Sequence, residues 1–148
     1  MWSNVTDNPL QRYVDWFESL SLSSPDDLHT IMTNDVHFSD PFNSVTGLDD
    51  TRKIFEDMFN MLDSTRFRIT HAAMAESEPP AALLRWEMDA VSRKSKEPIR
   101  IVGMSEVYFS DDGRVRVHID HWDAGRQFYE KLPLIGWLVR TIRSRMAA

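Results

Sequence analysis

Four long strand-like runs joined by short turns occupy the second half of the chain, and they limit the fold more than any other sequence feature. The runs cover residues 66–75, 82–92, 99–110 and 114–123. The turn-forming stretches "ESEPP", "RKSKEP" and "DDG" separate them. Because consecutive strands joined by short turns pair with opposite directions, we expect an antiparallel meander here.

The first half of the chain has a helical pattern instead. Apolar residues at helical spacing predict one helix over 9–20 and another over 48–63, with a short helix beginning near Pro25. A brief strand over 35–42 then runs into Pro41, which suits a strand end because proline donates no backbone N–H. Helices followed by a sheet, without repeats, indicate an α+β fold.

The chain has the size and apolar content of one ordinary domain. It contains 148 residues, of which 42% are hydrophobic and 11% aromatic, so it can build a core. We assign residues 1–125 to this domain. Residues 126–148 are predicted to form a basic amphipathic helical extension of it, broken near Pro133.

The C-terminal extension combines an apolar face with positive charge. Its apolar positions share one helical face: Leu134, Ile135, Leu138, Val139 and Ile142. Its basic side chains are Arg126, Lys131, Arg140, Arg143 and Arg145, opposed by Glu130. Three interpretations remain open. The helix covers the opening of the fold, docks on the sheet or a partner subunit, or contacts an anionic membrane peripherally, with Trp137 at the interface.

Composition also argues against several functional classes. The formal net charge of -6 disfavours nucleic acid as a partner, because neutralising phosphates requires an excess of Lys and Arg. The absence of cysteine excludes disulfides, thiolate metal sites and a cysteine nucleophile. The first residues lack the basic start and apolar run of a secretory signal, so we expect a soluble cytoplasmic protein.

Neither a metal nor a bound cofactor is predicted. The five histidines include no helical i, i+4 pair, and His118 and His121 point to opposite faces of a strand. The sequence contains no glycine-rich phosphate loop, no G-x-S-x-G elbow and no dinucleotide fingerprint.

The stretch "HFSDPF" places Asp40 between two aromatic residues and before a proline. One interpretation is that Asp40 orders the turn, as aspartate often does before proline. The other is that Phe38 and Phe42 desolvate the carboxylate, which makes it a stronger base for abstracting a proton next to a carbonyl. Tyr13 has a similar pair of interpretations, as a core residue of the first helix or as a functional hydrogen-bond donor.

The stretch "HIDHWD" contains a second group of polar residues. Strand alternation puts His118, Asp120 and Trp122 on one face. His118 and Asp120 then form either an acid–base dyad, in which the carboxylate orients the imidazole, or a structural ion pair.

The order of elements in "LQRYVDWFESLSLSSPDDLHTIMTNDVHFSDPFNSVTGLDDTRKIFEDMF" resembles the nuclear transport factor 2-like (SnoaL-like) superfamily, which includes ketosteroid isomerase. The resemblance covers about residues 9–123. It implies an α+β cone, in which a strongly curved antiparallel sheet wraps helices and a mostly apolar cavity. It also implies a homodimer that pairs through the convex face of the sheet.

The resemblance carries roles over to individual positions. Asp40 in "SDPF" stands where the isomerases have a catalytic base, and Tyr13 in "QRYV" stands where they have an oxyanion donor. Ser105 occupies the place of their neutral carboxylic acid, which is a departure from the family pattern. Asp120 matches a catalytic aspartate of the polyketide cyclases, in a His-x-Asp-x-Trp setting, and the same alignment turns His118 toward the cavity. The expected pocket-lining residues are Phe17, Phe38, Phe42, Phe55, Phe59, Ser105, Val107 and Trp122.

Together these observations predict a pocket protein for a small apolar or lipid-like molecule. Its expected chemistry is cofactor-independent acid–base catalysis of the isomerase, dehydratase or cyclase type. The alternative is a non-catalytic ligand-binding or protein-interaction module of the same fold, because this fold hosts both classes.

Overall fold

The computed structural model describes residues 8–21 and 24–147, apart from the side chain of Ser24. The helical elements are α1 (Pro9–Glu18), η2 (Ser24–Asp27), α2 (Leu28–Ile31), α3 (Leu48–Met61), α4 (Ala124–Gln127), η3 (Tyr129–Lys131) and α5 (Ile135–Met146). The strands are β1 (Met32–Ser39), β2 (Ser44–Thr46), β3 (Leu62–Met74), β4 (Ala82–Ser92), β5 (Pro98–Phe109) and β6 (Val115–His121).

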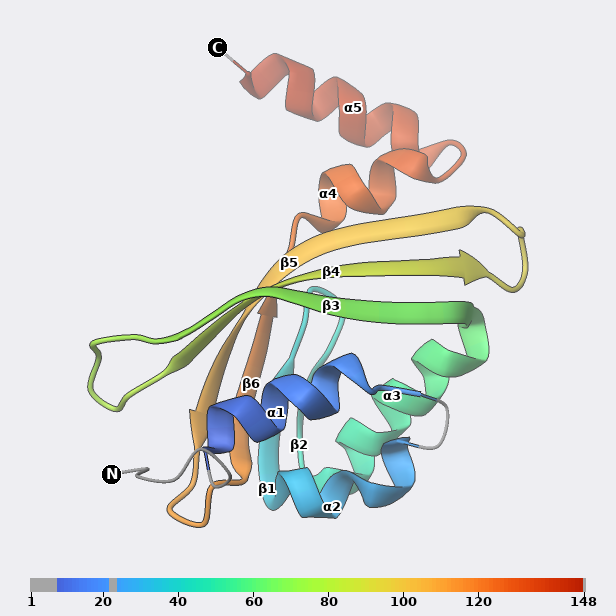
Figure 1. The fold of residues 1–148 in the computed structure, drawn as a ribbon. Coiled ribbons are helices and arrows are strands. Elements are labelled where there is room, and N and C mark those ends of the chain that lie inside the picture. The colour runs from blue at the N-terminus through green and yellow to red at the C-terminus, as the bar shows by residue number, and fades with distance from the viewer. Residues whose placement is uncertain (1–7, 22–23, 148) are drawn as a thin grey trace.

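The six strands form one strongly bent sheet in the order β2-β1-β6-β5-β4-β3 (Figure 1). Strands β3 to β6 pair antiparallel with their neighbours in sequence, which confirms the predicted meander and the α+β fold. The sheet is not antiparallel throughout, because β1 and β6 run parallel, with Phe38 opposite His118. The sequence did not predict this pair, because no short connection joins β1 to β6 and local turn signals therefore do not fix their relative direction.

The helices α1 and α3 lie against the concave face of this sheet (Figure 1). Asn8 caps α1 by accepting a hydrogen bond from the backbone N–H of Leu10 at 3.0 Å. The aromatic stripes of both helices, Tyr13 and Phe17 on α1 and Phe55 on α3, are at most 5% exposed. Burying these large rings supplies much of the hydrophobic stabilisation of the fold.

The C-terminal segment forms three helical pieces instead of one broken helix. The break predicted near Pro133 lies between η3 and α5, where Leu134 adopts a left-handed φ of 66°. The last helix, α5, packs mainly against η3 and lies beyond β4 and β5, away from α1 to α3 (Figure 1). Within the described residues, no helix has the length and apolar character needed to cross a bilayer.

Candidate functional site

A cavity of about 630 Å³ lies between the concave sheet face, α3 and the segment that follows β6. This volume is in the range of small-molecule sites. Most of its wall is apolar, because β4 and β5 place Trp86, Met88 and Ile101 there and α3 adds Phe55 and Met58.

The structure brings most of the predicted site residues to this wall. Those at the wall are Asp40, His118, Asp120, Phe17, Phe38, Phe42, Phe55 and Trp122. The other predicted lining residues, Phe59, Ser105 and Val107, are buried in the core behind the wall and are at most 5% exposed. Strand and helix periodicity gives the inward face of an element, but it does not separate residues that reach the cavity from those beneath it.

A line of hydrogen bonds connects Tyr13 to Asp120 through His118. The Tyr13 hydroxyl lies 2.7 Å from Nδ1 of His118, and Nε2 of His118 lies 2.7 Å from Oδ1 of Asp120. An ionised carboxylate only accepts hydrogen bonds, so Nε2 carries the ring proton and donates a hydrogen bond to Asp120. In the neutral ring, Nδ1 then accepts from the tyrosine hydroxyl.

Two more residues fix Asp120 from the other side. The Ser105 hydroxyl donates to Oδ1 of Asp120 at 2.5 Å, and the indole N–H of Trp86 donates to the Ser105 oxygen at 2.8 Å. Oδ1 of Asp120 therefore receives two donors, whereas no hydrogen bond from a described residue reaches Oδ2. Asp120 is on the cavity wall, and an oxygen without a partner among the described residues can still accept a hydrogen bond from a ligand.

Tyr13 takes a different place from the oxyanion donor that the resemblance implies. Its side chain is 1% exposed, it is not on the cavity wall, and its hydroxyl is bonded to His118. Burial, and next the negative charge of Asp120, raise the pKa of Tyr13 well above its ordinary value. Tyr13 therefore stays protonated, and its hydroxyl is held by His118. The oxyanion-donor role of Tyr13 stays a prediction.

Two aromatic rings stack on the imidazole of His118. Its ring stacks on Phe38, with centroids 5.0 Å apart and planes 9° apart, and on Phe17, with centroids 5.9 Å apart and planes 12° apart. Since χ rotation would break both stacks and both hydrogen bonds, the ring has one favoured orientation. His118 thus gives Asp120 a fixed donor.

Asp40 lies on the same wall but makes the contacts of a turn residue. Its Oδ1 accepts from the backbone N–H groups of Phe42 and Asn43, each at 2.7 Å. The side-chain amide of Asn43 donates to both carboxylate oxygens, at 3.1 and 3.2 Å. These contacts match the turn interpretation of "HFSDPF". Catalysis by Asp40 stays a prediction.

The charged groups on the wall restrict the ligand. Among the described residues, the wall carries the carboxylates of Asp40, Asp57 and Asp120, and it carries neither Lys nor Arg. An anionic group buried there would face like charges without a counterion, so a neutral or cationic group is favoured. The described part of the chain also holds no cluster of three or more His, Asp or Glu side chains suited to a metal ion.

The sequence left open that the C-terminal segment covers the opening of the fold, but it did not identify which residues of the segment line the cavity. Phe128 and Tyr129 line it and pack on Phe42, with ring centroids 5.1 and 6.0 Å apart. Gln127 anchors the segment, because its side-chain amide donates to the carbonyl of Val102 and accepts from the N–H of Val102. The aromatic pair directly after "DAGRQ" was the available signal.

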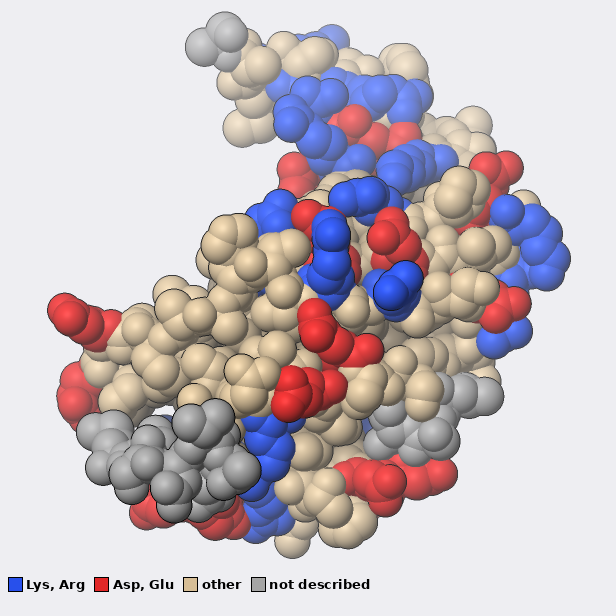
Figure 2. Space-filling model, in the orientation of Figure 1, with Lys and Arg blue, Asp and Glu red and all other residues tan. Residues whose placement is uncertain are grey.

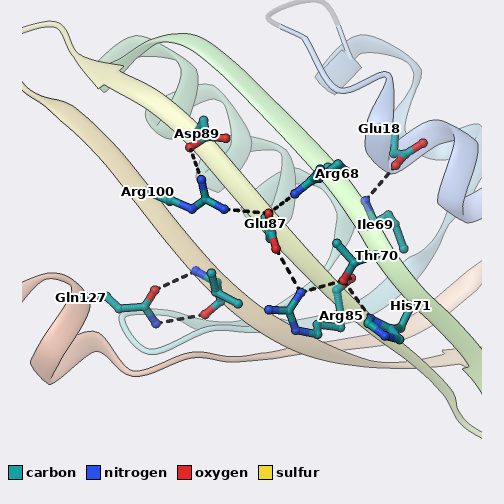
Figure 3. A network of polar contacts seen from close by, with 11 residues as sticks. Glu18, Arg68, Ile69, Thr70, His71, Arg85, Glu87, Asp89, Arg100 and Gln127 are labelled. Carbon is teal, nitrogen blue, oxygen red and sulfur yellow. Dashed lines mark hydrogen bonds and ion pairs between the residues drawn. The ribbon is translucent and has the colours of Figure 1, made fainter.

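A separate polar cluster lies on the opposite, convex face of the sheet. Figure 3 shows Glu87 held by three arginines, Arg68, Arg85 and Arg100. Hydrogen bonds from Arg68 and then Arg85 lower the pKa of Glu87. Because Trp86 and Met88 point into the cavity, strand alternation turns Glu87 away from it. This cluster therefore takes no part in the cavity site.

A comparison with protein-family models matches residues 11–118 to the SnoaL-like domain. The match begins within α1 and ends at His118, so it contains most of the cavity wall. A comparison with curated protein sequences gave no significant match.

Solved structures share the fold at low sequence identity. An NTF2-like protein of unknown function from Exiguobacterium sp. 255-15 superposes with a TM-score of 0.67 at 17% identity, over 78% of this chain and 98% of that one. A hypothetical protein with a ketosteroid isomerase-like fold from Catenulispora acidiphila, in complex with trimethylamine, gives 0.65 at 11%, over 80% and 88%. An LEH-like epoxide hydrolase from M. tuberculosis gives 0.63 at 15%, over 95% and 96%.

Proposed function

Since this chain belongs to the SnoaL-like domain family, we propose that it binds a small apolar or lipid-like molecule in the cavity and acts on it by cofactor-independent acid–base chemistry. Asp120 is the proposed acid–base group. The observation that carries the proposal is that Oδ2 of Asp120 has no hydrogen bond from a described residue, whereas Ser105 and His118 hold Oδ1.

The network supports a proton-transfer role in a specific way. A catalytic carboxylate must point in one direction, and the hydroxyl of Ser105 and the imidazole of His118 supply that constraint. The ligand carries no negative charge where it meets the wall, because Asp40 and Asp57 add negative charge there. An isomerase, dehydratase or cyclase type of reaction fits, since each needs one group that takes up and returns a proton.

Deuterium exchange tests this proposal without knowledge of the natural substrate. Apolar cyclic ketones with enolisable α-protons are incubated with the protein in D₂O, and α-deuteration is followed by NMR. We expect exchange with the wild type and a loss of at least about a hundredfold with Asp120→Asn, the size of one general acid–base group. Asp40→Asn is the matched control from the same wall, and we expect it to retain exchange.

Other outcomes would reassign the site. Loss of deuterium exchange with Asp40→Asn and not with Asp120→Asn would overturn the assignment of Asp120 and identify Asp40 as the base. No exchange with any ketone, together with a co-purified small molecule in native mass spectrometry, would favour the non-catalytic ligand-binding module. One observation favours the non-catalytic function: Tyr13 and Ser105 are both hydrogen-bonded to other residues of the chain, and such a network also serves to join α1 to the sheet.

A further inference from the structure

The last helix, α5, has an apolar stripe that the other described residues leave exposed. The stripe consists of Ile135, Leu138, Ile142 and Met146, which follow helical spacing and are 51%, 50%, 51% and 82% exposed. By contrast, the aromatic residues Tyr13 and Phe17 of α1 and Phe55 and Phe59 of α3 are at most 5% exposed. Exposed apolar surface of this kind marks a site of interaction.

The way α5 is held shows why its own domain does not cover the stripe. Glu130 receives Arg140 at its backbone carbonyl and Arg143 at its carboxylate, the latter at 2.5 Å. Gly136 lies so close to the Glu130 carbonyl that a Cβ would clash with it. Gly136, Arg140 and Arg143 are spaced four and three residues apart, so this side of α5 faces the body and the apolar stripe faces outward.

Positive charge lies beside the stripe. On a helix of about 3.6 residues per turn, Arg145 borders the stripe on one side, and on the other side lies Arg143, whose guanidinium is paired with Glu130. Lys and Arg side chains gather over this end of the molecule, although the whole chain has a formal charge of -6 (Figure 2). Trp137 lies on the other side of α5 from the stripe, so it is not part of the contact proposed below.

We propose that α5 docks on an anionic lipid bilayer, with the stripe of Ile135, Leu138, Ile142 and Met146 in the acyl boundary and Arg145 at the head groups. Apolar stripe and basic borders are the two features that interfacial helices combine. A second copy of this chain fits less well, because stripe-to-stripe pairing would bring two sets of arginines together. The helix also continues the segment whose Phe128 and Tyr129 line the cavity, so docking brings the cavity wall near lipid.

Vesicle flotation of the full chain tests the proposal. Vesicles of phosphatidylcholine are compared with vesicles that contain about one third phosphatidylglycerol, at low salt and at about 0.5 M NaCl. We expect the wild type to float with the anionic vesicles and to be released in part by salt. Wild-type protein that stays unbound to anionic vesicles would overturn the proposal.

Two variants separate apolar insertion from charge. Ser144→Glu and Ile142→Glu each add one negative charge to α5, but Ile142 is in the stripe and Ser144 is not. We expect Ser144→Glu to weaken partitioning by up to about fivefold, the effect of one charge near the surface. Ile142→Glu should weaken it by at least about tenfold more, because it also removes an apolar side chain from the bilayer.

The remaining outcomes also decide the matter. Equal weakening by the two variants would show that the stripe does not insert. Sedimentation velocity without lipid tests whether a second copy of the chain covers the stripe instead. If the wild type is a dimer that Ile142→Glu dissociates, and if it does not bind vesicles, the stripe is a contact between two copies. Flotation does not depend on catalysis, so failure of the proposed acid–base function would leave this result unaffected.

Discussion

At the scale of single residues, the polar network is defined by how its buried groups find partners. Tyr13 and His118 are 105 positions apart in sequence and both are buried, and each is the hydrogen-bond partner of the other. Buried polar groups stabilise a fold when every member is paired and destabilise it when one partner is removed. This property makes Tyr13 testable apart from any reaction.

The variant Tyr13→Phe removes the hydroxyl and keeps the ring. Nδ1 of His118 then loses its donor inside the core, and we expect the free energy of unfolding to fall by about 1–3 kcal/mol. Tyr108→Phe is the control, because its hydroxyl makes one long contact of 3.4 Å to Glu106 in a partly exposed place. That change should stay within about 0.5 kcal/mol. Equal effects of the two substitutions in urea denaturation would contradict the role given to Tyr13.

Much of the site could be predicted at this scale, and some of it could not. Alternation along "HIDHWD" placed His118 and Asp120 on the inward face, where the structure has them. Helical periodicity predicted that Tyr13 is buried. It did not predict the contact of its hydroxyl with His118, because that contact depends on how α1 packs across β6. For Asp40, the sequence left both a turn and a base open, and its contacts with Phe42 and Asn43 are those of a turn.

At the scale of elements, long periodic segments were predictable and short ones were not. The predicted strand over 82–92 coincides with β4, because its apolar alternation lasts through eleven residues. Strand β2 has three residues, Ser44–Thr46, too few to show a period, and it was not predicted. The amphipathic pattern of α5 identified an apolar face. It did not show whether this face points to the domain or to solvent, because tertiary contacts such as those of Glu130 set the orientation of the helix.

The pairing of β4 with β5 gives a prediction at this scale. Gly103 lies opposite Trp86, and a Cβ there would be 2.5 Å from the indole ring. We expect Gly103→Ala to push the ring aside, to weaken the hydrogen bond from Trp86 to Ser105, and to cost about 1–3 kcal/mol of unfolding free energy.

A double-mutant cycle checks the cause of that cost. In the background of Trp86→Phe the smaller ring leaves room for the added methyl group, so the two substitutions together should cost less than the sum of their separate effects. Strict additivity would show that Gly103→Ala acts through the backbone and not through the indole.

At the scale of the whole molecule, the buried core and the C-terminal extension are distinct. The cluster of buried apolar residues draws on α1 to α3 and the sheet, and it includes no described residue of α5. The convex face carries the arginine cluster around Glu87 and the exposed apolar side chains of Leu83 and Met104. Pairing of two chains through that face stays a prediction from the family resemblance.

Two truncations separate the contributions of the C-terminal pieces. Removing residues 135–148 deletes α5 with its exposed stripe, and we expect the free energy of unfolding to change by less than about 1 kcal/mol. Removing residues 124–148 also deletes Gln127, Phe128 and Tyr129, which bind Val102 and cover Phe42. The longer truncation should cost about 1–3 kcal/mol more, through lost apolar burial and two unpaired backbone groups. If urea denaturation finds that removing 135–148 alone costs as much, α5 packs on the domain and its stripe is not free for a membrane.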